Sequence, residues 1–131
     1  MARLCKVLIV EDNDDVRGLM EEMFDAEGYQ IRAVPNATEM RNAIAAAPDW
    51  DMLVIDMTLP GPEDGIHLAN EMVTQGYHVV LVTGNHLLVD RLDESGHPYL
   101  LKPFRVHSLL ELIDRLLREA ANECQRAARR A

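Results

Sequence analysis

Several polar groups in this chain follow short apolar runs, and together they could bind a phosphoryl group. Glu11 and Asp12 follow the first run, and single polar residues follow the other three: Asp56, Thr83 and Lys102. In an open parallel sheet, residues just past the carboxyl ends of the strands converge on one crevice. Three acids, a hydroxyl and an amine would meet there, and this set suits a phosphoryl group held with a divalent metal.

The three acids match the ligand preference of Mg²⁺ (or Mn²⁺). Mg²⁺ takes oxygen ligands in octahedral geometry and keeps several waters, so one or two carboxylates suffice. We expect Asp12 and Asp56 to be direct ligands and Glu11 to act through water. A carboxylate can also attack phosphorus and form an acyl phosphate, and Asp56 stands alone after the middle run. Asp56 is therefore the predicted phosphoacceptor.

The remaining groups would neutralise and bind the phosphoryl oxygens. Phosphoryl transfer depends on in-line positioning and charge neutralisation more than on acid-base catalysis. Lys102 supplies a compact cation, and the Thr83 hydroxyl and the Gly84 N–H can bond other oxygens if the threonine rotates toward the site. Any one of these residues alone is more simply a strand cap or a solvated side chain. Their joint occurrence after successive runs is what favours a site.

Composition narrows the possible functions. The chain has 131 residues, which fits one domain with a core of its own, and a formal net charge of −9, which argues against direct nucleic-acid binding. No apolar run approaches the ~20 residues that cross a bilayer, and no signal-peptide pattern precedes Lys6. The two cysteines lack metal-ligand or redox spacing. We expect a cytoplasmic protein without membrane association.

Strand-like runs alternate with helical spacing along the chain, which predicts an α/β fold with a parallel sheet. Residues 29–33 alternate apolar and polar side chains, as an edge strand does. Asn36 can cap a second helix, because Glu39 follows at capping-box spacing. The first helix is expected to face the sheet with an apolar stripe formed by Val16, Leu19, Met20, Met23 and Phe24. A third helix is expected from the spacing of Ile66, Ala69, Met72 and Val73.

The stretch between Thr83 and Tyr99 contains several helix breakers, so a short or absent helix is expected there. The last helix has a long apolar stripe. It begins either at the capping box formed by Ser108 and Glu111 or one turn earlier, and it continues past the sheet.

Four segments together resemble the receiver domain of bacterial response regulators. They are VLIVEDN (7–13), VIDMTLPGPEDG (54–65), VTG (82–84) and YLLKPF (99–104). Each is weak alone, but their order and spacing are specific. The resemblance implies a CheY-like, flavodoxin-like fold, a doubly wound five-stranded parallel sheet of order 2-1-3-4-5, here with a short or irregular fourth helix. It covers residues 1–118 as receiver domain and leaves 119–131 as an extension of the last helix, with no effector domain.

The resemblance also implies roles for particular residues. Glu11 and Asp12 match the acidic pair, Asp56 the phosphorylated aspartate, and Lys102 the lysine before a cis proline, Pro103. Further matches complete the site: the Thr58 carbonyl as a metal ligand, Thr83 as the switch hydroxyl, Thr58 and Asn85 as residues that tune the phosphoryl lifetime, and Tyr99 as the aromatic that moves with the threonine. Tyr99 is equally well explained as an edge-strand aromatic on the rim of the core.

The leading hypothesis is a stand-alone phosphoacceptor of a two-component phosphorelay. Asp56 would take a phosphoryl group from a phosphohistidine of a kinase or phosphotransfer protein, alter binding of a downstream protein, and then lose the group by hydrolysis. Such a chain is not a conventional enzyme, and it would be a monomer or weak dimer. With the fourth helix reduced, phosphorylation would order a loop rather than shift a preformed helix.

Two alternatives remain. A receiver-like module could bind partners without phosphorylation. An aspartate-nucleophile phosphohydrolase would also use Mg²⁺ and a strand-end aspartate, but such enzymes carry a second acid two residues later, where this chain has Thr58.

Overall fold

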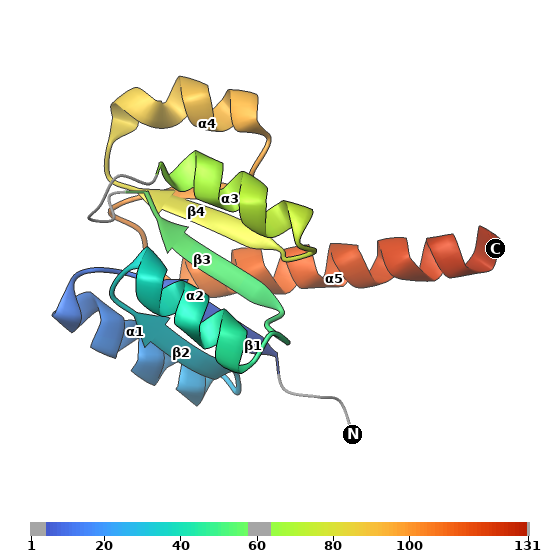
Figure 1. The fold of residues 1–131 in the computed structure, drawn as a ribbon, viewed down its shortest axis with the longest axis horizontal. Helices are drawn as coiled ribbons and strands as arrows, with labels where there is room; N and C mark the ends of the chain where they lie inside the picture. Colours follow the sequence, from blue (N-terminus) through green and yellow to red (C-terminus); the bar gives the residue numbers. More distant parts are fainter. Residues whose placement is uncertain (1–4, 58–63, 131) are drawn as a thin grey trace.

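The computed structural model describes residues 5–57 and 64–130, and it places a five-stranded parallel sheet at the centre of the molecule (Figure 1). The strands run in the order β2-β1-β3-β4-β5. Their bounds are β1 Lys6–Val10, β2 Gln30–Val34, β3 Met52–Asp56, β4 Val79–Thr83 and β5 Tyr99–Leu101. The fold class and strand order predicted from the sequence are confirmed.

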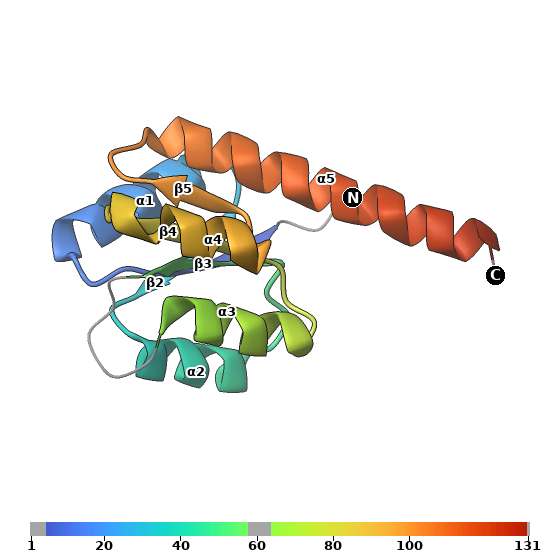
Figure 2. The same cartoon turned by 90° about the horizontal axis from the view of Figure 1, so that it is seen from above.

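Two layers of helix cover the sheet (Figure 2). Helices α1 (Asp14–Ala26) and α5 (Val106–Arg130) lie on one face, and α2 (Ala37–Ala46) and α3 (Gly65–Thr74) lie on the other. Because side chains alternate along a strand, each central strand contributes to both cores. In β1, Leu8 packs in the core under α2 and α3, whereas Val7 and Ile9 pack in the core under α1 and α5.

The edge position predicted for residues 29–33 is correct, since β2 pairs only with β1 among the described strands and alternates exposed and part-buried residues. The predicted cap of α2 is also present. The Asn36 side chain accepts a hydrogen bond from the Glu39 N–H at 2.8 Å. Asn13 caps α1 in the same way, accepting from the Val16 N–H at 3.0 Å.

The apolar stripes of α1 and α3 are only partly buried. Met20 and Phe24 are buried under α1, but Leu19 is 50% exposed and Met23 is 36% exposed. In α3, Val73 is 46% exposed. For Leu19 and Met23, the prediction that the stripe of the first helix faces the sheet is wrong, because α1 buries a narrower stripe than the sequence pattern spans. The exposed members are free to serve another purpose.

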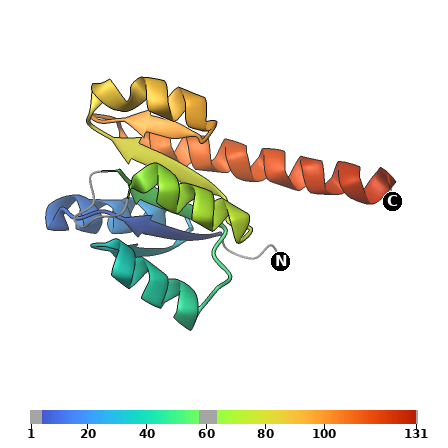
Figure 3. The same cartoon turned by 45° about the horizontal axis from the view of Figure 1, so that its top comes forward.

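The segment between β4 and β5 is helical but short, so the alternative without a fourth helix is wrong. A 3₁₀ turn, η1 (His86–Leu88), leads into α4 (Val89–Ser95), which lies at the β5 side of the molecule (Figures 1 and 3). The helix ends at Gly96, whose φ of 75° is left-handed. Because α4 is already formed, the expectation that phosphorylation orders a loop here loses its basis.

Few contacts hold α4 in place. Leu92 is the buried side chain among its described residues. Two exposed polar contacts tie the helix to its surroundings: Arg91 donates to the Asp64 carboxylate at 2.6 Å, and the Tyr99 hydroxyl donates to the Asp93 carboxylate at 2.6 Å. The first contact holds the pKa of Asp64 below its ordinary value.

Helix α5 begins at Val106, whereas a helix capped by Ser108 would begin at Leu109, about one turn later. A start at the Ser108 and Glu111 capping box is therefore wrong, and the earlier start is right. Leu109, Leu110 and Ile113 are buried against the sheet. The helix then continues past the sheet on the side of the amino ends of the strands, away from their carboxyl ends (Figure 1). Over the described residues, no helix combines the length and apolarity needed to cross a membrane.

The division of α1 into a buried and an exposed apolar set gives a test of the fold. Met20→Ala should lower the free energy of unfolding by about 2–5 kcal/mol, the usual cost of truncating a buried large side chain. Leu19→Ala should cost less than about 1 kcal/mol, because that side chain is half exposed and alanine favours the helix. Urea denaturation followed by circular dichroism measures both, and equal losses would contradict this packing of α1.

Candidate functional site

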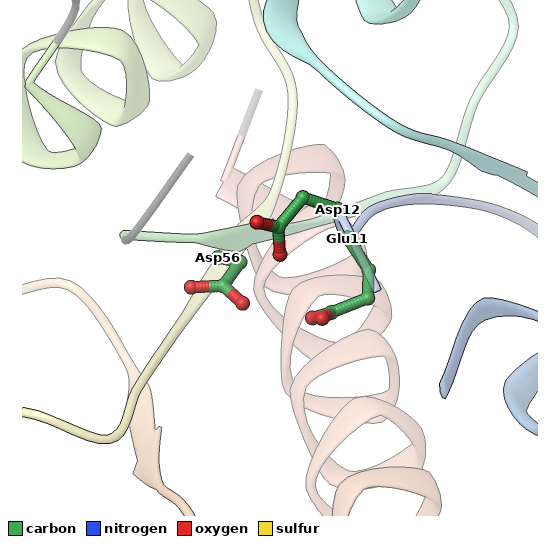
Figure 4. Close-up of side chains that lie close together, drawn as sticks. All are labelled: Glu11, Asp12 and Asp56. Carbon is green, nitrogen blue, oxygen red and sulfur yellow. The ribbon is translucent and has the colours of Figure 1, made fainter. Parts of the chain in front are cut away.

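The three predicted acids converge at the carboxyl end of the sheet. Glu11 and Asp12 directly follow β1, and Asp56 is the last residue of β3, which lies beside β1 in parallel register. One carboxylate oxygen from each residue lies within 4.8 Å of the others, and Figure 4 shows the three side chains gathered around one space. Glu11 and Asp56 are buried, whereas Asp12 is exposed to solvent.

Lys102 forms the electrostatic partner of the two buried acids. Its Nζ donates to Asp56 Oδ2 at 2.7 Å and to Glu11 Oε2 at 3.1 Å. Both acids are almost inaccessible, with side chains 2% and 3% exposed, whereas the lysine side chain is 31% exposed. The lysine therefore reaches from the surface into the site and partly balances its negative charge.

Burial and neighbouring charge perturb the pKa values of these groups. Burial raises the pKa of Glu11, and the adjacent Asp56 carboxyl raises it further, while Lys102 opposes both effects. Burial alone would lower the pKa of Lys102, but its hydrogen bonds to Asp56 and Glu11 outweigh this, so the pKa lies above its ordinary value. Lys102 is therefore protonated at neutral pH. Its single positive charge is fewer than the negative charges of the three acids.

The donor set fits a hard divalent cation. Three carboxylates offer oxygen ligands, the exposed Asp12 leaves room for water ligands, and one lysine does not neutralise three acids. Burial, together with the adjacent Asp56 carboxyl, raises the pKa of Glu11 in spite of Lys102. Thr58, predicted to supply a carbonyl ligand and to tune the phosphoryl lifetime, lies outside the described residues.

Thr83 ends β4 beside this space and is fully buried. Its hydroxyl oxygen accepts a hydrogen bond from the Asn85 N–H at 3.0 Å. The Asn85 side chain in turn accepts from the Leu87 N–H at 3.0 Å, at the start of η1. These two hydrogen bonds connect Thr83 to the turn before α4, and the predicted switch role of the threonine stays a prediction. Gly84 and Asn85 are exposed beside it.

Tyr99 and Pro103 are the other two predicted residues on β5 and its following loop. Tyr99 is partly buried against the α2 and α3 core, and its hydroxyl contacts Asp93 of α4 rather than the acids. Its predicted part in a switch stays a prediction. The Lys102–Pro103 peptide bond is cis, as the resemblance implied.

The sequence analysis missed Arg17, which contacts the loop that carries the acidic pair. Its guanidinium donates to the carbonyl oxygens of Glu11 at 2.9 Å and Asp12 at 3.2 Å, and it also contacts the Asp14 carboxylate. A signal was present: a cation near the start of a helix opposes the helix dipole, so an arginine there calls for local acceptors.

A groove of about 420 Å³ opens beside Lys102 and is mainly apolar. It lies between α1 and the loop from β5 to α5, and Lys102 forms part of its wall. The other lining residues are Val16, Leu19, Met20, Pro103, Phe104 and Val106. The half-exposed Leu19 therefore borders the site instead of the core.

Comparisons with known proteins agree with this geometry. A family model described as the response regulator receiver domain matches residues 7–114. The chain is 31% identical over 120 residues to the aerobic respiration control protein ArcA of Escherichia coli K12, covering 88% of this chain and 50% of ArcA. It is 28% identical over 126 residues to the transcriptional regulatory protein AruR of Pseudomonas aeruginosa, covering 90% and 51% respectively. The chain thus spans about half the length of these relatives.

Solved structures show the same fold. A CheY-like response regulator receiver domain protein from Methanospirillum hungatei has a TM-score of 0.79 and 25% identity, covering 92% of this chain and 99% of that one. A receiver domain protein from Clostridium thermocellum has a TM-score of 0.77 and 20% identity, covering 90% and 98%.

The contacts of Lys102 give a test of the site's electrostatics. Lys102→Met should lower the free energy of unfolding of the metal-free protein by about 1.5–3 kcal/mol, the range for hydrogen bonds to charged groups. Added Mg²⁺ should recover more stability in the variant than in the parent, because the variant's acids lack their cation. Urea titrations in EDTA and in Mg²⁺ measure both effects.

Arg41→Met is the matched control, because it removes an exposed ion pair with Glu71 far along the sequence from the site. Its cost should be below about 1 kcal/mol and independent of Mg²⁺. A Lys102 variant that behaved like this control would show that the lysine does not stabilise the acids.

Proposed function

Because the chain belongs to the response regulator receiver family of two-component signalling, we propose that Asp56 is its phosphoacceptor and that phosphorylation changes the binding of a partner protein. The observation that carries the proposal is the placing of Asp56 at the end of the middle strand, 98% buried, beside two acids and 2.7 Å from the lysine Nζ. A structural aspartate would gain nothing from two further acids at this point.

The chemistry follows from the residues at the site. A carboxylate oxygen of Asp56 attacks phosphorus, a P–O bond forms, and the bond from phosphorus to the donor's imidazole nitrogen breaks. The electron pair of that bond leaves with the imidazole, and Asp56 becomes an acyl phosphate. Lys102, released from the Asp56 carboxylate, pairs with a phosphoryl oxygen, and Thr83 and the Gly84 N–H bond others.

Mg²⁺ bound by Asp12 and Asp56, with Glu11 acting through water, would supply charge neutralisation on the phosphoryl oxygens. Loss of the phosphoryl group needs water on the same line of attack. Asn85 stands two residues after Thr83, where its side chain caps η1, and in this proposal it influences the access of that water.

Two observations weigh on the alternatives. For a phosphohydrolase, a second acid two residues after Asp56 would serve as general acid, and the sequence has Thr58 there. For a module that binds without phosphorylation, the chain would have no need of the buried acids and their lysine. A phosphorelay uses every charged group of the site.

The first prediction from this proposal is specific labelling of Asp56. With acetyl phosphate and Mg²⁺, the parent should gain one phosphoryl group by intact mass and lose it on standing, since acyl phosphates hydrolyse. Asp56→Asn, which preserves shape, should gain none, and EDTA should abolish labelling of the parent. Labelling of Asp56→Asn to the parental level would assign the wrong residue, and no labelling of the parent would favour binding without phosphorylation.

We further propose that the phosphohistidine partner docks over the groove between α1 and the β5–α5 loop. Lys102 lines the groove and contacts Asp56, so a donor seated there lies next to the acceptor. Leu19 supplies an exposed apolar anchor. The turn before α1 and the first residues of that helix carry three exposed acids, Asp12, Asp14 and Asp15, which suits a partner with basic or neutral residues around an apolar face.

Docking predicts a donor-dependent effect of Leu19→Glu. The substitution should slow transfer from a phosphorylated histidine kinase core at least tenfold, because it places a charge in an apolar contact. Labelling by acetyl phosphate should be unchanged, since that small donor needs no docking surface. The kinase core is selected beforehand as one that labels the parent. Val73→Glu is the control, because Val73 is an equally exposed apolar residue of α3. Equal slowing in both variants would refute the assigned face.

A further inference from the structure

Arg17 is bound to the backbone of the acidic loop by an unusual set of contacts. Its guanidinium donates to two successive carbonyl oxygens, those of Glu11 and Asp12, and also contacts Asp14. Its side chain is 18% exposed, so most of this arginine is covered. The acceptors lie five and six residues back in the sequence, which places the cation across the turn between β1 and α1.

We propose that Arg17 is a positioning residue for divalent cation binding, which fixes the Glu11–Asp12 backbone so that both carboxylates face the metal. The inference rests on the metal site of the proposed function and adds a residue that contacts neither metal nor phosphoryl group. It acts through the two peptide units that carry the ligands.

The need for such a residue follows from Asp12. Within the described part of the chain, the structure gives the exposed Asp12 carboxylate no hydrogen bond, so its direction depends on its own backbone. Glu11, by contrast, is held by Lys102 and by the Asn13 N–H, at 3.1 and 3.3 Å. A planar guanidinium can bond several acceptors in fixed directions, which an ammonium cannot, and it therefore fixes the peptide planes.

Arg17 also removes competing ligands. Two carbonyl oxygens at the end of a strand are themselves suitable oxygen donors for Mg²⁺ or Ca²⁺. In this structure both accept hydrogen bonds from Arg17. Each of these oxygens therefore has less acceptor capacity left for a metal ion, which favours the side-chain carboxylates as ligands from this loop.

The direction in which metal affinity changes when Arg17 is removed distinguishes a positioning role from a simple effect of its charge. Arg17 is a cation beside a cation site, so its charge alone weakens metal binding. Removing it should tighten binding if charge is all that matters, and weaken binding if positioning dominates. Substitutions of residues that orient metal ligands typically cost 10–100-fold in affinity.

The experiment measures Mn²⁺ binding by electron paramagnetic resonance of the free ion, with no phosphodonor present. We expect a Kd about tenfold higher in Arg17→Gln than in the parent, and an increase in Arg17→Lys as well, because lysine keeps the charge but loses the planar set of donors. Arg41→Gln, which removes the same charge from an exposed ion pair on α2, should bind like the parent.

Equal or tighter Mn²⁺ binding by Arg17→Gln would overturn the inference while leaving the metal site itself intact. A parent that binds no Mn²⁺ would overturn the metal site of the proposed function and the role of Arg17 with it. Circular dichroism establishes that each variant is folded, and if Arg17→Gln is not, the charge-preserving Arg17→Lys decides: weaker binding supports the inference and equal binding refutes it.

Labelling with acetyl phosphate provides a second readout. In Arg17→Gln the Mg²⁺ concentration for half-maximal rate should rise about tenfold, while the rate at saturating Mg²⁺ stays within about twofold of the parent. A fall in the saturated rate with unchanged half-saturation would mean that Arg17 acts on the reaction by another route, and would refute the positioning role.

Discussion

The site depends on two carboxylates held out of water at the point where the apolar strands end. Desolvation makes a buried carboxylate costly unless a cation and hydrogen bonds compensate it. Lys102 provides part of that compensation from the position after β5, a strand distant from β1 in the sequence. The order of the sheet is what makes the contact possible, because β3 and β4 lie between the two and bring Asp56 and Thr83 into the same crevice.

The rest of the structure serves this constraint in different ways. The central strands are apolar on both faces, so the two layers of helix fix the strand ends firmly. Asn13 and Arg17 then hold the turn that follows β1, one as a helix cap and the other through backbone carbonyls. The backbone that carries the acids is therefore held by packing and hydrogen bonds, whereas the side of the site at Asp12 is open to solvent.

The sequence was informative wherever a pattern is local. Alternating strand and helix periods predicted the parallel sheet, Asn36 with Glu39 predicted a cap, and the residues after the strands predicted which side chains would converge. It could not tell which members of an apolar stripe meet the sheet, since Leu19 and Phe24 lie at opposite ends of a stripe roughly 140° wide at 3.6 residues per turn, and the way α1 lies on its neighbours decides which end is buried. Arg17 was not predicted, because the sequence shows only that an arginine near a helix start needs local acceptors, and not that these are the backbone carbonyls of Glu11 and Asp12.

Helix α4 has a consequence of its own. A short helix with Leu92 as its buried anchor, and otherwise tied by exposed contacts, loses less free energy when it comes away from the sheet than a helix with several buried side chains would. Its backbone amides will therefore open to solvent more often than those of β3 or β4, as a separate unit of low local stability. The packed sheet is thus joined to one helix of lower local stability, and Thr83, at the end of β4, hydrogen-bonds to the turn that connects the two.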